Sequence, residues 1–241
     1  MGNDSGLIYT NRGNTGLLDL LSSSPGRILD CGCGAGDNAK ILQQRGWRVT
    51  GVTIDPREQE TVRQFCEVVH LADLENGLPP GIDGAFDTVL ASHVLEHLAW
   101  PERLVHDVRE RLNPGGVFAV ALPNIAHYGQ RISLLRGQFN YTETGQLDRT
   151  HLRFYTYRTA IQLLERNGYE LVHTVVEGTL PWWKARWLVS LSMVGRVDKW
   201  AVRQRPNLLG HQSLLLARPV GGVCDVPSPH QQRLPAGNAR T

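Results

Sequence analysis

The sequence predicts an α/β fold with a doubly wound, mostly parallel sheet of seven strands and helices on both faces. Short apolar runs alternate with helical patterns through the first half of the chain, as βαβ units require. Glycine-rich turns lie at 32–36, after the first expected strand, and at 113–116, before the fifth. A length of 241 residues is enough for one large domain with a full core.

The expected strands are short apolar runs bounded by turn residues. They cover residues 27–30, 48–54, 67–70, 86–91, 117–122, 171–176 and 212–217. The expected helices show apolar residues at helical spacing between such boundaries, and they cover residues 15–21, 37–44, 56–65, 94 or 101 to 112, 125–136, 156–166 and 181–202. Gly46 stops the second helix, Pro56 suits the first turn of the third, and Thr156 caps the sixth.

The chain is expected to form a single domain over residues 1–218. The alternation loosens in two segments, 123–160 and 180–205, which are interpreted as insertions or a lid on the substrate side of the sheet. Residues 219–241 are rich in glycine, proline and polar side chains, so we expect a disordered tail there.

Composition indicates a globular protein, with 41% hydrophobic and 20% charged residues. The formal net charge of +2 gives no reason to expect a nucleic-acid partner, which usually needs a clustered basic face. Residues 1–10 carry no basic and apolar leader pattern, and no run approaches the roughly 20 apolar residues of a membrane span. Four cysteines, two of them at 31 and 33, suggest no disulfide framework, so a cytoplasmic location is expected.

The most informative segment is Ile28-Leu29-Asp30-Cys31-Gly32-Cys33-Gly34-Ala35-Gly36, an apolar strand that runs into three alternating glycines. Glycines allow positive φ angles and let the backbone approach a ligand at the carboxyl end of the first strand. A dinucleotide-binding turn would need glycine where Asp37 stands, and an aspartate there disfavours a pyrophosphate. The pattern favours a phosphate-free ligand with an ammonium group, which Asp30 can help to hold.

This turn resembles motif I of class I, Rossmann-like S-adenosylmethionine-dependent methyltransferases. Further matches follow in the same order as in that family, at 49–55, 71–74, 86–97, 112–116, 123–124 and 148–154. The last two are similar to a bacterial branch related to the ubiquinone-biosynthesis and methionine-regulon type methyltransferases. The resemblance covers about residues 15–218 and implies S-adenosyl-L-methionine as the cofactor.

The resemblance also implies where the cofactor binds. Thr53 stands at the position where an acid usually bonds the ribose, and Asp55 lies two residues on; either can take that role, with help from Glu58. Asp73 would accept a hydrogen bond from the adenine amine. The implied cofactor residues are Asp30, Gly32, Cys33, Gly34, Gly36, Thr53, Ile54, Asp55, Asp73, Leu74, Ser92 and His93.

Methyl transfer to a hydroxyl or amine needs a base, and histidine suits this role near neutral pH. His151, in the insertion on the acceptor side, is the first candidate, and His93, at the exit of the fourth strand, is the second. The candidate acceptor contacts are Tyr128, Tyr141, Asp148, Arg149 and Arg153.

The leading functional hypothesis is methylation of a hydroxyl on a small molecule or sugar. N-methylation of a small molecule stays open beside it, as does a non-catalytic S-adenosylmethionine-binding partner protein. A nicotinamide-dependent oxidoreductase is disfavoured by the glycine spacing. Methylation of a nucleic-acid base is disfavoured because Ser92-His93-Val94-Leu95 replaces the Asn/Asp-Pro-Pro-aromatic motif typical of that reaction.

No metal site is predicted. His93, Glu96 and His97 have a spacing that places both histidines on one helical face, but no fourth ligand can be named. Cys31 and Cys33 have no distant cysteine partners with which to bind zinc.

The segment from Trp182 to Trp200 combines tryptophans with basic side chains. We interpret it as a lid or core element, with a homodimer contact as an alternative and peripheral contact with a membrane surface as a weaker one.

Overall fold

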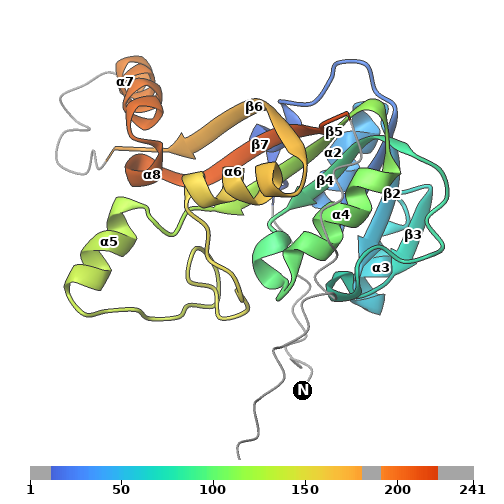
Figure 1. The fold of residues 1–241 in the computed structure, drawn as a ribbon, viewed down its shortest axis with the longest axis horizontal. Helices are drawn as coiled ribbons and strands as arrows, with labels where there is room; N and C mark the ends of the chain where they lie inside the picture. Colours follow the sequence, from blue (N-terminus) through green and yellow to red (C-terminus); the bar gives the residue numbers. More distant parts are fainter. Residues whose placement is uncertain (1–11, 181–190, 222–241) are drawn as a thin grey trace, which may run out of the picture.

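The computed structural model describes residues 12–180 and 191–221. Within them, seven strands form one sheet in the order β3-β2-β1-β4-β5-β7-β6 (Figure 1). The strands are β1 (Arg27–Cys31), β2 (Arg48–Thr53), β3 (Val68–Leu71), β4 (Phe86–Ser92), β5 (Leu112–Pro123), β6 (Tyr169–Gly178) and β7 (Gly210–Pro219). β1 to β5 pair in parallel, whereas β7 runs antiparallel to both β5 and β6. The predicted doubly wound, mostly parallel, seven-stranded Rossmann-like sheet is confirmed.

The helices are α1 (Thr15–Leu18), α2 (Asp37–Gln44), α3 (Pro56–Val62), α4 (Pro101–Arg111), α5 (Tyr128–Leu135), α6 (Tyr157–Arg166), α7 (Leu191–Gln204) and α8 (Pro206–Leu209), with short 3-10 turns η1 (Leu74–Asn76) and η2 (Leu95–His97). The helix expected from residue 94 or 101 is split in two. Pro101 occupies the first turn of α4, where its missing N–H costs nothing, and η2 forms a separate turn. Glu96 and His97 therefore lie at the exit of β4.

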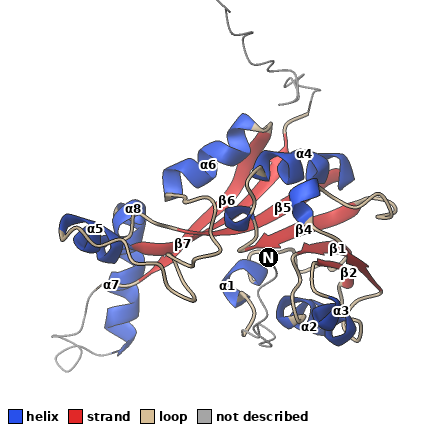
Figure 2. Ribbon diagram, turned by 90° about the horizontal axis from the view of Figure 1, so that it is seen from below, coloured by secondary structure: helices blue, strands red, loops and turns tan. Residues whose placement is uncertain are grey.

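Alternating side chains of the central strands face opposite sides of the sheet and build two cores. Leu29, Val89 and Phe118 face α4 and α6, whereas Ile28, Leu90 and Ala119 face α1 and α2. Figure 2 shows α4 and α6 on one side of the sheet and α1, α2 and α3 on the other. Both faces of the central strands are thus buried, and ligand chemistry is left to the strand ends.

The Asn-Pro-Gly-Gly turn at 113–116 lies inside β5 rather than before it. The register with β4 passes from Phe86↔Leu112 to Thr88↔Val117, so the four turn residues loop out of the ladder. The expected turn is present, but Leu112 before it pairs with β4 just as Val117 after it does.

Residues 124–156 leave the end of β5 and return to α6 by way of α5 and an irregular loop. Asn124 anchors this segment: its side chain is fully buried and Nδ2 donates to the carbonyls of Gly210 at 2.7 Å and Asn207 at 3.1 Å. The insertion is therefore tied to α8 and β7, which Figure 1 shows beside α5. The single-domain boundary at 218 stays a prediction, and the tail expected at 219–241 lies almost wholly outside the described residues.

Candidate functional site

The glycine turn after β1 has the backbone that the sequence predicts. Gly32, Gly34 and Gly36 all have positive φ angles, of 71°, 52° and 97°. A Cβ added to Gly32 would lie 2.6 Å from Val94, and one on Gly36 would lie 2.8 Å from Val62, so packing requires glycine at both positions. A Cβ on Gly34 would meet nothing nearer than a Glu58 oxygen at 3.9 Å. The turn is therefore closed on two sides and open at Gly34.

Asp30 is a buried carboxylate on β1 just before this turn. It is 1% exposed, and neither carboxylate oxygen has a hydrogen-bond partner among the described residues. Burial raises the pKa of Asp30 from 3.8 to about 7. An unpaired buried carboxylate is costly, so this position suits a ligand that brings a positive charge or hydrogen-bond donors.

Two acidic side chains, Asp55 and Glu58, lie just after β2, and they have different hydrogen-bond partners. Asp55 caps α3 through the Arg57 amide at 2.8 Å and also pairs with the Arg57 guanidinium. These bonds lower the pKa of Asp55, led by the side-chain hydrogen bond from Arg57. Glu58 instead accepts from the buried Thr53 hydroxyl at 2.7 Å and lies beside the open Gly34 position.

The ends of β2 and β3 expose apolar side chains next to each other. Ile54 is 65% exposed and Leu71 is 48% exposed, and Leu71 is in register with Thr53. Asp73 caps η1 by accepting from the Glu75 amide at 2.9 Å, whereas Leu74 is buried. This edge presents an apolar surface with a carboxylate beside it, as an adenine ring would require.

His93 occupies an unusual backbone position directly after β4. Its φ of 57° makes it the one non-glycine residue in the described ranges with a left-handed conformation. Nδ1 lies 3.1 Å from Oε1 of Glu96, and Nε2 lies 2.9 Å from Oε1 of Gln212. Burial works against a charged ring here, but the hydrogen bond to Glu96 and its charge outweigh it, and the pKa of His93 is raised.

The orientation of Gln212 fixes the role of His93. Nε2 of Gln212 donates to Glu177 at 2.6 Å, which leaves its Oε1 to face His93. Both His93 nitrogens then meet acceptors, an arrangement that favours the protonated ring. Ser92, the preceding residue, accepts a hydrogen bond from Asn14 at 3.3 Å.

His151 is in a different state. Nδ1 lies 3.3 Å from the carbonyl oxygen of Gln146, so Nδ1 carries the proton and Nε2 keeps its lone pair. Burial lowers the pKa of His151, which keeps the ring neutral near neutral pH. Its ring packs edge-on against His97, with ring centroids 4.8 Å apart.

Two predicted acceptor residues are aromatic. Tyr128 begins α5, contacts the His127 ring at 4.1 Å between centroids and packs against the small cluster of α7 and α8. Tyr141 is 52% exposed and meets Phe139 edge-on. Tyr128 is thus partly a packing residue, whereas Tyr141 lies at the surface.

The three charged acceptor candidates have intramolecular partners. Asp148 accepts from the Thr150 hydroxyl at 2.6 Å, and Arg149 pairs with Glu143 at 2.7 Å. Arg153 donates to the Ala99 carbonyl and lies over the Trp100 ring. Asp148 lies near the histidines: its burial is outweighed by hydrogen bonds from Thr150 and by the charges of His151 and His97, which together lower the pKa of Asp148.

The fold brings to this site polar residues that the sequence did not indicate, namely Asn14, Glu177 and Gln212. Glu96 and His97 are predicted from the sequence only as rejected metal ligands. Gln212 reaches the site because β7 pairs antiparallel with β5, which sets Gln212 opposite Pro123. No local pattern indicates that pairing. The Glu96-His97 pair was visible, but its partner His151 lies in a distant loop.

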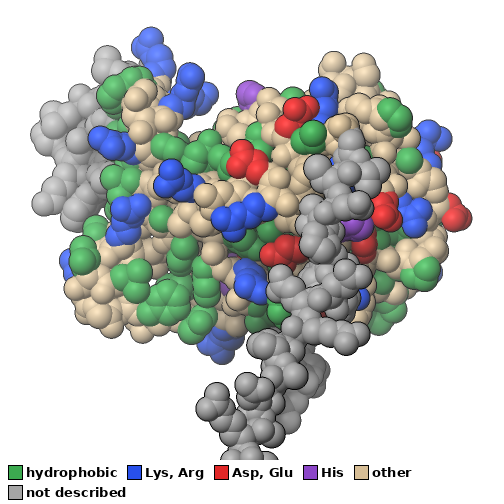
Figure 3. Space-filling view, in the orientation of Figure 1, with side chains coloured by type: hydrophobic (Ala, Val, Ile, Leu, Met, Phe, Trp, Pro, Cys, Tyr) green, Lys and Arg blue, Asp and Glu red, His purple; other side chains and the backbone are tan. Residues whose placement is uncertain are grey.

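The described part of the tryptophan-rich segment is α7. Trp200 is 65% exposed, and Figure 3 shows Lys and Arg side chains gathered around this end of the molecule. Trp182, Trp183 and Trp187 lie outside the described residues, so the lid, dimer and membrane-surface interpretations stay predictions. No described helix has the length and hydropathy needed to cross a bilayer.

These features fit S-adenosylmethionine. The unpaired Asp30 matches its ammonium group, the open Gly34 position leaves room for its chain, Glu58 and Thr53 suit the ribose hydroxyls, and exposed Ile54 suits the adenine. A pyrophosphate would meet the Asp30, Glu58 and Asp37 carboxylates. The donor set therefore disfavours a dinucleotide.

Comparison with known proteins gives the same class. Residues 9–174 match the family model described as "Methyltransferase domain". A ubiquinone biosynthesis O-methyltransferase of Chromobacterium violaceum is 31% identical over 112 residues, which are 41% of this chain and 45% of that protein. A trans-aconitate 2-methyltransferase of Delftia acidovorans is 29% identical over 126 residues, 49% of this chain and 47% of that protein. The matched regions thus span less than half of each relative.

A crystal structure of a SAM-dependent methyltransferase from Archaeoglobus fulgidus superposes with a TM-score of 0.56 at 21% identity, covering 81% of this chain and 86% of that one. Sheet order, glycine turn and unpaired acid define a class I, Rossmann-like nucleoside-binding protein. The chain belongs to the S-adenosylmethionine-dependent methyltransferase family. S-adenosylmethionine is the methyl donor of that family, as the sequence analysis predicts.

Proposed function

We propose that this protein transfers the methyl group of S-adenosylmethionine to a hydroxyl group of a small, polar molecule. The observation that carries the proposal is Asp30, a buried carboxylate without a hydrogen-bond partner in the described ranges, beside the open turn at Gly34. S-adenosylmethionine supplies a methyl group that is already activated by its sulfonium. The protein's main tasks are therefore to bind, to align the acceptor and to remove a proton.

Asp30, Thr53 and Glu58 hold the cofactor in this proposal. Asp30 pairs with the ammonium, and it does so in its ionised form, which the ligand's charge favours. Glu58 takes the ribose position because Asp55 already serves Arg57. Ile54 covers one face of the adenine.

Proton removal falls to the side of the site that carries His151. A general base needs a lone pair at working pH, and Nε2 of His151 has one while its ring is neutral. Both nitrogens of His93 face acceptors, on Glu96 and Gln212, so His93 suits orienting an acceptor better than accepting a proton. This difference favours His151 as the candidate base.

A polar pocket near His151 suits a hydroxylated acceptor. The pocket has a volume of about 350 Å³ and is lined mainly by amide and hydroxyl side chains, among them Gln130, Asn140, Thr142 and Gln146. Gln146 also contributes the carbonyl that orients His151. Uncharged hydrogen-bonding groups match sugar-like or polyol hydroxyls better than they match a charged amine.

The test combines binding with transfer. Calorimetry with S-adenosylhomocysteine should show one site, and labelled S-adenosylmethionine should methylate members of a panel of sugars, polyols, phenols and amines. We expect label on hydroxyl oxygen. Binding of the cofactor without transfer to any hydroxyl, or transfer to amines alone, would contradict the proposal.

A further inference from the structure

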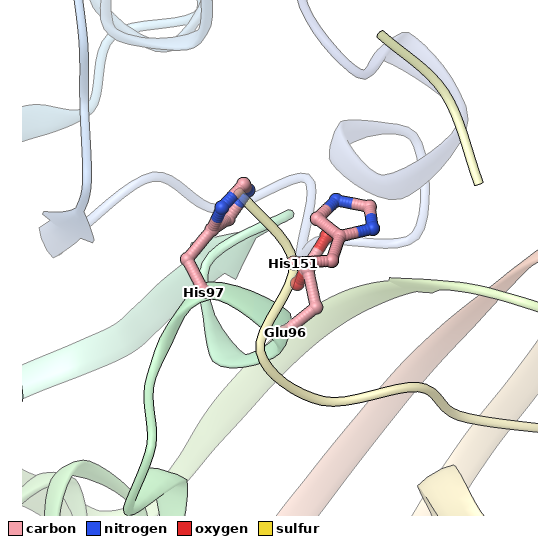
Figure 4. A group of neighbouring side chains, drawn as sticks. All are labelled: Glu96, His97 and His151. Carbon is pink, nitrogen blue, oxygen red and sulfur yellow. The ribbon is translucent and has the colours of Figure 1, made fainter. Parts of the chain in front are cut away.

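Glu96, His97 and His151 form a cluster that the proposed role of His151 does not fully explain. One ligand atom from each side chain lies within 4.8 Å of the others. Glu96 and His97 come from η2, and His151 comes from the loop before α6; Figure 4 shows the two rings and the carboxylate gathered where that loop crosses η2. The amides of Leu152 and Arg153 donate to the Glu96 carbonyl at 2.8 and 2.9 Å and hold the two segments together.

The Glu96 carboxylate is the first sign of a ligand. Its side chain is fully buried, and Oε1 faces Nδ1 of His93 at 3.1 Å. Oε2 is also buried but has no hydrogen-bond partner in residues 12–180 and 191–221. Burying a carboxylate oxygen without a partner costs free energy. A bound cation next to Oε2 would offset this cost.

The histidines are arranged as metal ligands are. Nδ1 of His97 lies 3.1 Å from the Thr150 hydroxyl, which itself donates to Asp148 at 2.6 Å and so must accept from His97. Nδ1 of His151 donates to the Gln146 carbonyl. Both rings therefore carry their proton on Nδ1, and their Nε2 lone pairs are available. Metal-binding histidines are usually oriented through their second nitrogen in this way.

We propose that Glu96, His97 and His151 bind one divalent transition-metal ion, and that this ion holds the hydroxyl of the acceptor. The cation-binding part stands by itself, whereas the acceptor role rests on the proposed methyltransferase function. Two imidazoles and one carboxylate leave coordination positions open for water or substrate, as in catalytic zinc sites. Imidazole favours Zn²⁺, Fe²⁺ or Co²⁺ over Mg²⁺ and Ca²⁺, which prefer oxygen ligands.

The geometry needs only a small adjustment. Ligand atoms about 2.1 Å from a tetrahedrally bound ion lie about 3.4 Å apart, so the most separated pair, now within 4.8 Å, would approach by about 1.4 Å. Rotation of the His97 and His151 side chains supplies such a movement, because neither ring is held at Nε2 by any described residue. His151 thus takes the place of His93 in the set of Glu96 and two histidines considered from the sequence.

Bound at the Nε2 lone pair of His151, the ion would replace that ring as the group that makes the acceptor lose its proton. A divalent cation lowers the pKa of a coordinated hydroxyl, so the O–H bond breaks and the proton leaves to solvent. The oxygen electron pair then forms the bond to the methyl carbon, while the carbon–sulfur bond breaks and its electron pair stays on sulfur. No oxidation or reduction takes place, so Zn²⁺ is sufficient.

The experiment uses the untagged full chain, stripped with a chelator and dialysed. Calorimetry with Zn²⁺ and the visible spectrum with Co²⁺ should both show one equivalent bound, and Mg²⁺ should bind much more weakly. Glu96→Gln and His151→Ala should each weaken Zn²⁺ binding at least tenfold. His106→Ala, which removes a surface histidine of α4 with 62% side-chain exposure, is the matched control and should leave binding unchanged.

S-adenosylhomocysteine affinity, measured on every variant, shows whether the fold survives. Wild-type protein that binds S-adenosylhomocysteine but no stoichiometric Zn²⁺ overturns the metal site and leaves the proposed function intact. Equal Zn²⁺ affinity in Glu96→Gln, His151→Ala and wild type overturns the site as well. Stoichiometric Zn²⁺ with no methylated acceptor supports the metal site while the proposed function fails. Turnover that survives complete chelation overturns the acceptor role of the ion.

Discussion

Two regions of the molecule each contain a buried carboxylate near the end of a central strand. Asp30, on β1, belongs to a cofactor half made of β1 to β3 with α2 and α3, at the right of Figure 1. Glu96, after β4, belongs to an acceptor half made of η2, residues 124–156 and β6 and β7. Each has at least one oxygen without a partner in the described structure.

Their surroundings differ, and the difference indicates different ligands. Asp30 has no hydrogen-bond partner among the described residues, and burial raises its pKa to about 7. Glu96 faces the His93 ring through Oε1 and lies in a cluster with the ring nitrogens of His97 and His151. The first environment suits an organic ammonium and the second a metal ion. Unpaired buried carboxylates thus mark both parts of the site, and their neighbours distinguish the ligand classes.

The largest expected effect is that of Gly34→Val, which should disable the cofactor half and leave the acceptor half intact. Gly34→Val adds a side chain that meets no protein atom closer than 3.9 Å at its Cβ, so it would occupy the ligand space. We expect S-adenosylhomocysteine binding to fall below detection in calorimetry, while Zn²⁺ binding persists. Gly137→Val is the matched control, because Gly137 also has a positive φ, of 71°, and open space around its Cβ. Retained S-adenosylhomocysteine affinity in Gly34→Val would place the cofactor elsewhere.

The next largest effect is a loss of turnover caused by a change in the acceptor half alone. His151→Ala should lower turnover by about a hundredfold or more, the usual range for loss of proton-transfer help, with S-adenosylhomocysteine affinity within about twofold of wild type. His173→Ala, which removes an exposed histidine of β6, serves as the control. Initial rates and calorimetry measure the two quantities separately. Equal losses in both would mean that His151 supports the whole site rather than the acceptor.

The sequence predicts the cofactor half well because its parts are local. The glycine turn directly follows β1, Thr53 ends β2, and Asp73 follows β3, so strand order alone brings them to one edge. The sequence did not predict how the two acids divide their partners: Glu58 accepts from Thr53, whereas Asp55 accepts from Arg57. Such a choice depends on side-chain geometry within one helical turn.

The acceptor half is predicted poorly because its contacts are long-range. His93 and Gln212 are 119 residues apart, and Asn124 bonds to Gly210 across 86 residues. These contacts exist because β7 enters the sheet antiparallel between β5 and β6, which no periodicity indicates. The His97–His151 pair was absent from the prediction because His151 lies in an irregular loop far along the chain, which the Leu152 and Arg153 amides hold against the Glu96 carbonyl.

Asp30→Asn should have opposite effects on binding and stability. Between 3.8 and about 7 the folded chain holds a proton on Asp30 that the unfolded chain has released, so Asp30 makes stability fall as pH rises through that window. Asp30→Asn removes this loss and should be more stable than wild type at pH 8 by about 1–3 kcal/mol without cofactor. Its S-adenosylhomocysteine affinity should fall about tenfold.

The pH dependence of binding provides the check. Wild-type affinity for S-adenosylhomocysteine should rise from pH 6 to pH 8 as Asp30 ionises, and Asp30→Asn should show no such rise. The neighbouring thiols of Cys31, Cys33 and Cys66 have raised pKa values and stay neutral over this range. Asp87→Asn is a contrasting control: backbone and side-chain hydrogen bonds from Arg27 and Asn113 lower the pKa of Asp87, so its loss should reduce stability and spare binding. Parallel pH profiles for wild type and Asp30→Asn would remove Asp30 from the binding site.

The smallest effect distinguishes the two acids of the cofactor half. Glu58→Gln should weaken S-adenosylhomocysteine binding about three- to tenfold, the value of one or two hydrogen bonds. Asp55→Asn keeps the cap on α3 and loses only an exposed pair with Arg57, so affinity should stay within about twofold. Calorimetry resolves the two. The reverse ranking would mean that ligand binding breaks the Asp55–Arg57 pair, and the ribose would then be bound from the cap of α3 instead of from its first turn.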